Sequence, residues 1–372
     1  MRLKGITWDH RRAIDPLVET MPLFKARHPE IEIEWSSRPL SGFEFTPVST
    51  LAESYDLIIL DHPFMGAVAA AQTLVPIDDI VGREDPFVGP SLETYRMGGK
   101  TWALPVDAAC QVGVSRRDLL AKLDSVPPGN WAELMALGAK ALKRGQFLAM
   151  GFKGVHSLMT FFTLMANVGS PCASNGKQDF ANRQTAREVL AMMRDLLRHC
   201  PPESLDWNSI ALHDAMTTRD DLVFCPAVYC YATYAEADQR RPLHFHDLPG
   251  PTGHGGSAIG GTGLAISARS KHIAEAMAYV RFAAESATQM AFALHHGQPA
   301  HRRVWEDDAI NERFGNCYRN TRATIDSSWI RPRYDGYLSF QEKGGEMMEA
   351  HLRGIIGEDE LLSGLQDLHA GG

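Results

Sequence analysis

The stretch that decides the fold runs from Asp247 to Val304, DLPGPTGHGGSAIGGTGLAISARSKHIAEAMAYVRFAAESATQMAFALHHGQPAHRRV. A Pro/Gly turn at 248–251 and a glycine-rich loop at 253–263 predict a flexible connection. An apolar strand at 264–266 follows, and then a helix whose apolar residues keep helical spacing from Ala274 to Ala284. A second turn, at 297–299, closes the stretch. This order predicts a chain that leaves one lobe, inserts an element in another lobe and returns.

The composition is that of an ordinary folded protein large enough for two domains. The chain has 372 residues, of which 44% are hydrophobic and 22% are charged. A formal net charge of −8 argues against nucleic acid as the main partner. No apolar run approaches the ~18 residues that a membrane span needs, so membrane insertion is not expected.

The first part of the chain alternates strands and helices. Strands are predicted at 3–7, 31–35 and 57–60, and the last is a continuous apolar run of the kind found in central, doubly covered strands. Asp15 is predicted as a helix N-cap with Pro16 in the first turn, and Pro22 should kink or shorten that helix. Strand–helix alternation predicts an α/β fold with parallel strands.

Several short motifs, taken in order, resemble family 1 extracellular solute-binding proteins, the binding components of ABC importers for sugars and related solutes. The motifs are Leu104-Pro105-Val106-Asp107, Arg116-Arg117-Asp118-Leu119, Asn130-Trp131-Ala132-Glu133-Leu134, Leu248-Pro249-Gly250-Pro251, 259–267, Ser270-Lys271 and 297–302. The segment 111–115 departs from the family, which usually carries bulkier apolar and aromatic residues there.

The resemblance implies a two-lobe periplasmic-binding-protein-like fold of type II, whose lobes are joined by a multi-segment hinge. Lobe 1 is predicted to comprise residues 1–107 and 254–300, and lobe 2 residues 108–253 and 301–372. The family's activity implies that a small polar or aromatic-containing solute, carbohydrate-like by default, binds in the cleft between the lobes, which then close by hinge motion. No chemistry, metal or cofactor is implied. The implied partners are that solute and, if the protein is exported, an ABC permease. The binding protein itself is expected to be a monomer.

Loops that leave the carboxyl ends of strands build the sites of α/β folds, and five such loops carry polar or aromatic residues. Carboxylates accept paired hydrogen bonds, aromatic faces stack on apolar surface, and glycine lets backbone N–H groups approach a ligand. The candidate ligand-binding residues are Trp8, Asp9, His10, Asp61, His62, Phe64, Asp107, Tyr229, Tyr231, Gly260, Gly261 and Thr262.

Each candidate also has a structural interpretation. Trp8 and Phe64 also fit as core aromatics, and Asp9 and Asp61 each stand where a helix N-cap would. The Gly260-Gly261 pair also fits a simple turn between the lobes. Two tyrosines at positions 229 and 231 share a face only if the segment is extended, whereas they point apart on the helix expected to open there.

The three aspartates at 9, 61 and 107 all follow apolar strands, so their side chains are expected to point toward one cleft. Carboxylates brought together repel, which should raise at least one pKa unless a cation or a hydroxyl-rich ligand intervenes. His10 and His62 stand beside two of these aspartates and offset part of the charge when protonated. A neutral polyol or a cation is therefore expected to be favoured over a dianion.

Catalytic and metal-binding alternatives rest on fewer residues. Cys110 follows the expected lobe crossover and resembles, in position only, the nucleophile of thiaminase I, an enzyme on the same fold; a small buried cysteine is the structural alternative. His244 and His246 would share one face of a strand, but no third zinc ligand stands at a recognisable spacing.

The N-terminus, MRLKGI, runs straight into the first strand without an apolar signal region. The chain as it stands is therefore expected to be cytoplasmic, and periplasmic if it is a trimmed mature form. A cytoplasmic location would favour the enzyme alternative or a cytoplasmic solute carrier or sensor. The six scattered cysteines favour free thiols over a disulfide framework.

Overall fold

The computed structural model describes residues 1–82, 85–174 and 178–371. It divides into two compact units of mixed α/β structure, each built from several segments of the chain. Unit 1 comprises Met1–Ala109, Gly260–Ile310 and Arg333–Leu338, and unit 2 comprises Cys110–Ile259, Asn311–Pro332 and Ser339–Gly372. The strands β6 (Leu104–Ser115) and β10 (Ile259–Ile266) contain two of the crossings between the units.

The sheet of unit 1 has the strand order β2-β1-β3-β10. The strands β1 (Arg2–Trp8), β2 (Glu32–Arg38) and β3 (Leu57–Leu60) run parallel, and β10 is antiparallel to β3 with Gly263 opposite Leu60. All four residues of β3 are buried, as predicted for a central strand. The carboxyl ends of β1, β2 and β3 therefore meet the amino end of β10 at one edge of the sheet.

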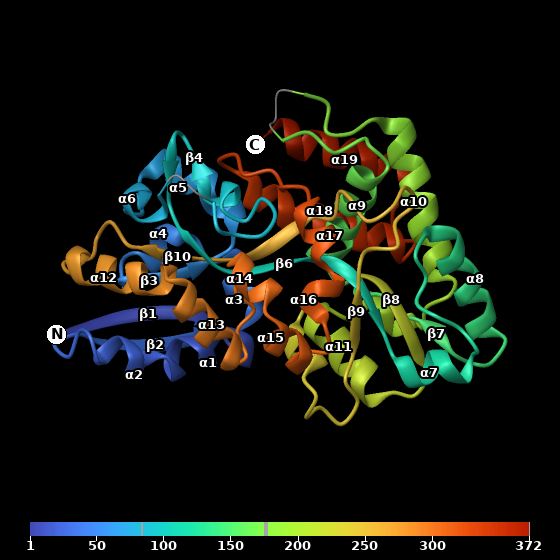
Figure 1. The fold of residues 1–372 in the computed structure, drawn as a ribbon. Coiled ribbons are helices and arrows are strands. Elements are labelled where there is room, and N and C mark those ends of the chain that lie inside the picture. The colour runs from blue at the N-terminus through green and yellow to red at the C-terminus, as the bar shows by residue number, and fades with distance from the viewer. Residues whose placement is uncertain (83–84, 175–177, 372) are drawn as a thin grey trace. The chain divides into compact units, whose positions relative to one another are not determined.

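Two short helices, α1 (Arg11–Glu19) and α2 (Met21–Lys25), run along β1 and β2 (Figure 1). The predicted start of the first helix is wrong: its N-cap is His10, whose side chain accepts a hydrogen bond from the backbone N–H of Arg12, and Pro16 lies inside the helix. The expected interruption at Pro22 is confirmed, because Pro22 stands in the first turn of a separate helix.

The other elements of unit 1 are short, apart from two helices that follow β10. Arg333 contacts the 3-10 turn at 93–95, where its Nη1 donates to the carbonyls of Glu93 and Thr94 at 2.7 Å each. The elements are α3 (Leu40–Phe45), α4 (Val48–Leu51), the 3-10 turn at His62–Phe64, α5 (Met65–Ala71), α6 (Asp78–Val81), the 3-10 turn at Glu93–Tyr95, β4 (Arg96–Met97), β5 (Lys100–Thr101), α12 (Ile273–Ala284), α13 (Ser286–Leu294), α14 (Arg302–Glu306) and the first half of α15 (Asp308–Arg313), which continues into unit 2.

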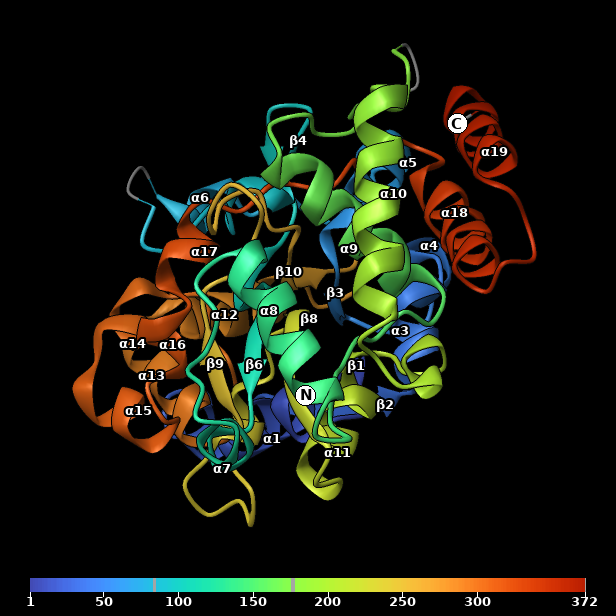
Figure 2. The same ribbon diagram turned by 90° about the vertical axis from the view of Figure 1, so that its right-hand side faces the viewer.

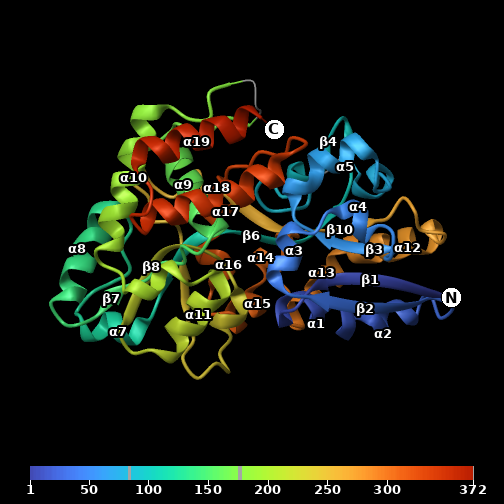
Figure 3. The ribbon, with the colours of Figure 1, turned by 180° about the vertical axis from the view of Figure 1, so that it is seen from behind.

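Unit 2 contains the strands β7 (Phe147–Leu148), β8 (Leu222–Tyr229) and β9 (His244–His246), with the second half of β6. Here β6 pairs antiparallel with both β8 and β9, and β7 pairs parallel with β8. The helix α11 (Ser209–Thr218) packs beside β8, as Figure 3 shows. Every residue of β6 is buried, and most of its residues are small or apolar, apart from Asp107 and Gln111.

The helices of unit 2 cover this sheet. In α8 (Trp131–Leu142) the side chain of the N-cap Asn130 accepts from the backbone N–H of Glu133 at 3.0 Å. The C-terminal helices α18 (Tyr337–Leu352) and α19 (Glu358–Ala370) lie side by side in Figure 2. The remaining elements are α7 (Arg117–Lys122), α9 (Val155–Asn167), α10 (Arg183–Leu197), the 3-10 turns at Pro202–Leu205 and Ala232–Ala235, α16 (Cys317–Asn320) and α17 (Arg322–Asp326).

Within the described part of the chain, no helix combines the length and the apolar character that crossing a bilayer would require.

Candidate functional site

The polar residues predicted at the strand ends of unit 1 come from neighbouring strands. Asp9 and His10 follow β1, and Asp61 and His62 follow β3, which pairs directly with β1. Because Gly263 of β10 lies opposite Leu60, Thr262 stands beside the end of β3. The structure therefore brings these residues to one edge of the sheet, where α/β folds place their ligands.

Asp61 serves as the N-cap of the 3-10 turn at His62–Phe64, and a capping role was the structural alternative predicted for it from the sequence. Its Oδ1 accepts from the backbone N–H of His62 at 2.8 Å and lies 3.0 Å from Nδ1 of the same histidine. The His62 side chain is fully buried, whereas that of Asp61 keeps 18% of its surface exposed. A carboxylate oriented by a buried histidine and open to solvent is suited to accept hydrogen bonds from hydroxyl groups.

Asp9 and His10 are the more accessible pair. Asp9 is exposed and its backbone N–H donates to the carbonyl of Arg38 at 2.7 Å. His10 is half-buried, and its Nδ1 accepts from the backbone N–H of Arg12 at 3.1 Å. The cap orients the imidazole of His10 at the start of α1.

Asp107 is engaged by an arginine that the sequence did not single out. Arg12 donates from Nε to Oδ2 at 2.7 Å and from Nη2 to Oδ1 at 2.6 Å, and both side chains are buried. Burial raises the pKa of Asp107, an effect that the charge and hydrogen bonds of Arg12 oppose and the charge of Asp61 reinforces. No sequence signal pointed to Arg12, because the partners stand 95 positions apart.

The segment around Asp107 is fixed by backbone contacts as well. Ala108 donates its N–H to the carbonyl of Gln298 at 3.0 Å, and Gln298 Nε2 returns a hydrogen bond to the carbonyl of Ala108 at 2.8 Å. Gly261 has φ +100°, and a Cβ there would clash with the carbonyl of Asp107. Glycine at 261 is therefore required by close packing of two backbones.

A small hollow opens beside these residues. Its volume is ≈ 20 Å³, which holds about one water molecule, so it is too small for a sugar. The residues that line it include Trp8, Arg12, Asp107, Thr262 and Gln298. Asp107, Arg12 and Thr262 thus lie in a densely packed part of unit 1.

The two aromatic candidates of unit 1 have different surroundings. Trp8 is 4% exposed, and its ring centroid lies 5.0 Å from that of Phe43. Phe64 is 2% exposed and belongs to the hydrophobic core with Ile58 and Met65. The structure therefore places Phe64 as a core residue, while Trp8 borders the polar edge.

In unit 2, Tyr229 is the last residue of β8 and Tyr231 follows it in extended conformation. The predicted helix opening at Tyr229 is wrong, because only a 3-10 turn forms, at Ala232–Ala235. Tyr231 is 6% exposed and its ring packs against His213, at 5.6 Å between centroids. Tyr229 is half-buried.

Cys110 lies in β6 and is 1% exposed. Burial raises the pKa of its thiol well above the ordinary value, with a further contribution from Cys230. Nucleophilic cysteines have lowered pKa values in electropositive, partly exposed surroundings, so this environment is opposite to the one an enzyme would need. None of the described cysteines forms a disulfide.

His244 and His246 do lie on one strand, β9, as expected. His246 Nε2 lies 2.8 Å from Ser115 Oγ, and burial lowers the pKa of His246 to about 4. Among the described residues no group of three or more His, Cys, Asp and Glu side chains is arranged to hold a metal ion.

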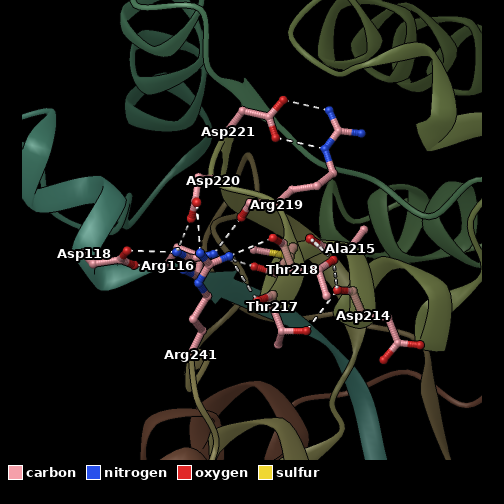
Figure 4. Close-up of polar contacts among 11 residues, drawn as sticks. Arg116, Asp118, Asp214, Ala215, Thr217, Thr218, Arg219, Asp220, Asp221 and Arg241 are labelled. Carbon is pink, nitrogen blue, oxygen red and sulfur yellow. Dashed lines mark hydrogen bonds and ion pairs between the residues drawn. The ribbon is translucent and has the colours of Figure 1, made fainter.

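A further charge network surrounds the buried Arg116 in unit 2, whose motif with Asp118 was quoted above only as a family resemblance. Arg116 is 1% exposed, and it donates to both carboxylate oxygens of Asp118 at 2.8 Å and to the carbonyls of Met216 and Arg219, also at 2.8 Å (Figure 4). Arg241 reaches the same helix end through the carbonyl of Thr218 at 2.7 Å. These cations satisfy the last carbonyls of α11 and have a structural role.

Solved structures show what this fold is similar to. Maltose-bound MalE3 of T. maritima superposes with a TM-score of 0.82 at 16% identity, covering 98% of each chain. The GacH receptor of Streptomyces glaucescens gives 0.82 at 17% identity, covering 98% of this chain and 96% of its own. A solute-binding protein of an ABC transporter from Thermotoga lettingae, bound with α-D-tagatose, gives 0.85 at 13% identity, covering 100% and 99%.

At such low identities these structures establish the fold, which is the predicted two-lobe periplasmic-binding-protein fold. No curated protein matches the sequence. The sequence itself matches a bacterial family over residues 7–197, which include β2, β3 and the first crossing strand. The chain therefore belongs to the bacterial extracellular solute-binding proteins.

Proposed function

We propose that this protein is the solute-binding component of an ABC-type importer and binds a small hydroxyl-rich solute without transforming it. Its partners would be that solute and a membrane permease, and the binding protein would act as a monomer outside the cytoplasmic membrane. Family membership supports the binding role. The ligand class is supported by structurally similar proteins described with maltose, α-D-tagatose, ribitol and D-mannitol.

The observation that carries the proposal is the polar edge of the unit 1 sheet. Asp61, held by its buried neighbour His62, and the exposed Asp9 present carboxylates beside Trp8. Carboxylates that accept from hydroxyl pairs, beside an aromatic ring that covers apolar C–H surface, are what a sugar or polyol needs. The lobe boundaries predicted from the sequence, 1–107 with 254–300 against the rest, remain part of this proposal.

The burial of Cys110 gives no support to the enzyme alternative. A cysteine nucleophile needs an accessible thiolate, and burial disfavours the thiolate form of this side chain.

Calorimetric titration tests the proposal with a panel of maltose, acarbose, D-tagatose, ribitol and D-mannitol. Binding of at least one of them with a stoichiometry near one, with the ligand recovered unchanged by NMR, is the expected result. Conversion of a bound ligand into product would favour an enzyme. A panel without any binding would contradict the ligand class.

A further inference from the structure

The last residue of β2, Arg38, carries a guanidinium that is buried without a hydrogen-bond partner. Its Nε, Nη1 and Nη2 atoms are all buried, and none of them donates to another described residue. No described carboxylate comes within the 4.0 Å of an ion pair. Burial lowers the pKa of Arg38 to about 10, although the nearby Tyr55 opposes this. Buried arginines are normally paired with a carboxylate, whereas Arg38 has no such counter-charge among the described residues.

One aromatic ring lies close to this guanidinium, and its N–H groups have no hydrogen-bond partner among the described residues. The central carbon of the guanidinium lies 5.7 Å from the ring centroid of Phe43, and Phe43 packs in turn on Trp8. A cation–π contact places the charge over the face of the ring and does not satisfy the N–H donors as a hydrogen bond to an oxygen would. The N–H groups lie in the plane of the guanidinium, where their fork matches the two oxygens of a carboxylate.

Arg38 lies at the same edge of the sheet as the proposed solute site. Trp8 and Arg38 are register partners in the parallel pair of β1 and β2, and Asp61 follows β3 on the other side of β1. Two strand spacings separate Arg38 from Asp61, or about 10 Å between backbones. Trp8 Nε1 is also buried without a described partner, so a second donor stands near the arginine. This span suits a solute with a sugar-sized body and one charged end.

We propose that Arg38 binds a carboxylate of the solute, so that the preferred ligand is a monoanionic sugar acid or polyol acid. This inference rests on the proposed function and narrows its ligand class. The guanidinium edge would accept the carboxylate as a bidentate pair, while Asp61 and Asp9 accept from the hydroxyl groups. A dianion is disfavoured because these two carboxylates stand at the same edge.

Entry of the ligand requires a local movement. The short helix α3 begins after Pro39 and carries Phe43 over the guanidinium, and a Cβ on Gly42 would lie 3.8 Å from Arg38 Cδ. Since the nitrogen atoms are buried and Phe43 of α3 lies beside the guanidinium, we expect α3 to shift when the carboxylate binds.

The test uses matched pairs of acidic and neutral ligands: D-gluconate with D-glucitol, D-glucuronate with D-glucose, and D-galacturonate with D-galactose. Each is titrated into the wild type, Arg38→Met and Arg38→Lys, with the exposed Arg2→Met as the control variant. In the wild type, at least one acid should bind about tenfold or more tightly than its neutral partner, since hydrogen bonds to charged groups are the stronger class. Arg38→Met should lose this preference, and Arg38→Lys should keep only part of it.

A second readout needs no ligand. Arg38→Met keeps the apolar stem and removes a charge without a partner, so the unliganded variant should have a higher Tm than the wild type. A lower or unchanged Tm would show that the guanidinium is already compensated and would count against the inference.

The outcomes separate this inference from the proposed function. If neutral members bind as tightly as their acids, or if Arg38→Met retains the preference for acids, the inference is overturned while the proposed function stands. If no member of either series binds to the wild type, the inference is overturned, and the proposed function is then decided by the panel of maltose, acarbose, D-tagatose, ribitol and D-mannitol.

Discussion

Arg12 holds Asp107 through two hydrogen bonds, Nε to Oδ2 at 2.7 Å and Nη2 to Oδ1 at 2.6 Å, with both side chains buried in unit 1. Asp107 was expected to face the solute as a free carboxylate. The pairing instead commits the carboxylate to the protein, and it joins the start of α1 to the start of β6.

Removing one member of this pair should destabilise unit 1 strongly. Arg12→Met leaves a buried carboxylate without its counter-charge, and we expect a loss of about 3–5 kcal/mol in the free energy of unfolding. Urea denaturation measures this, with Arg27→Met as the control because the Arg27–Glu285 pair is half exposed and should be worth at most ~1 kcal/mol. Equal losses in the two variants would contradict the role given to Arg12.

A similar loss of stability is predicted for unit 2 when Arg116 is replaced. Arg116→Met would leave carbonyls at the end of α11 without their donor, and a loss of about 3 kcal/mol or more is expected. Arg198→Met is the matched control, because the side chain of Arg198 is 76% exposed and pairs only with Asp195 on the surface. Denaturation curves that coincide for the two variants would exclude a structural role of the network in Figure 4.

Acid should destabilise unit 2 through two of its histidines. Burial lowers the pKa of His156 and of His246 from 6.5 to about 4, so the folded state disfavours their protonated forms. Each buried neutral histidine therefore contributes to the free energy of unfolding. This contribution is fully present above the pKa of the unfolded chain, near 6.5, and is lost as the pH falls toward 4, by at most about 3 kcal/mol for each histidine.

Thermal denaturation between pH 7 and 5 tests whether stability decreases on acidification. The Tm should fall with pH in the wild type and fall less in His156→Gln, whereas the exposed His254→Gln should follow the wild type. A Tm that rises on acidification, or identical slopes in all three proteins, would contradict the assignment.

The thiol of Cys110 should be unreactive in the native protein. Brief treatment with iodoacetamide at pH 8, followed by mass spectrometry of the peptides, should leave Cys110 unmodified, because the buried side chain carries a raised pKa. The same treatment in denaturant should modify all six cysteines and serves as the control. Rapid native labelling of Cys110 would revive the nucleophile interpretation.

Local sequence patterns predicted the elements whose causes are local. The apolar run at 57–60 became β3, and the helix expected over Ala274 to Ala284 became α12, because apolar periodicity reports which faces are buried. The interruption at Pro22 follows from the proline ring alone. The first helix was misplaced because Asp15 is a good N-cap by type, while His10 supplies the actual cap three residues after the predicted end of the first strand.

The parts of the site that the sequence missed depend on residues far apart in the chain. Arg12 meets Asp107 across 95 positions, and Gln298 meets Ala108 across 190. The isolated guanidinium of Arg38 is visible only when the surroundings of its nitrogen atoms are known. By contrast, the strand-end rule led directly to Asp9, His10, Asp61 and His62, because topology alone places them at one edge.

The central claim, that carboxylates at the strand ends of unit 1 bind the solute, is tested most directly by titrating the identified ligand into Asp61→Ala. The matched control is Asp79→Ala, which removes an exposed carboxylate from α6. Calorimetry should show a loss of about 1.5–3 kcal/mol of binding free energy for Asp61→Ala and no loss for the control, since a charged hydrogen bond is worth that much. Equal affinity of Asp61→Ala and the wild type would contradict the account.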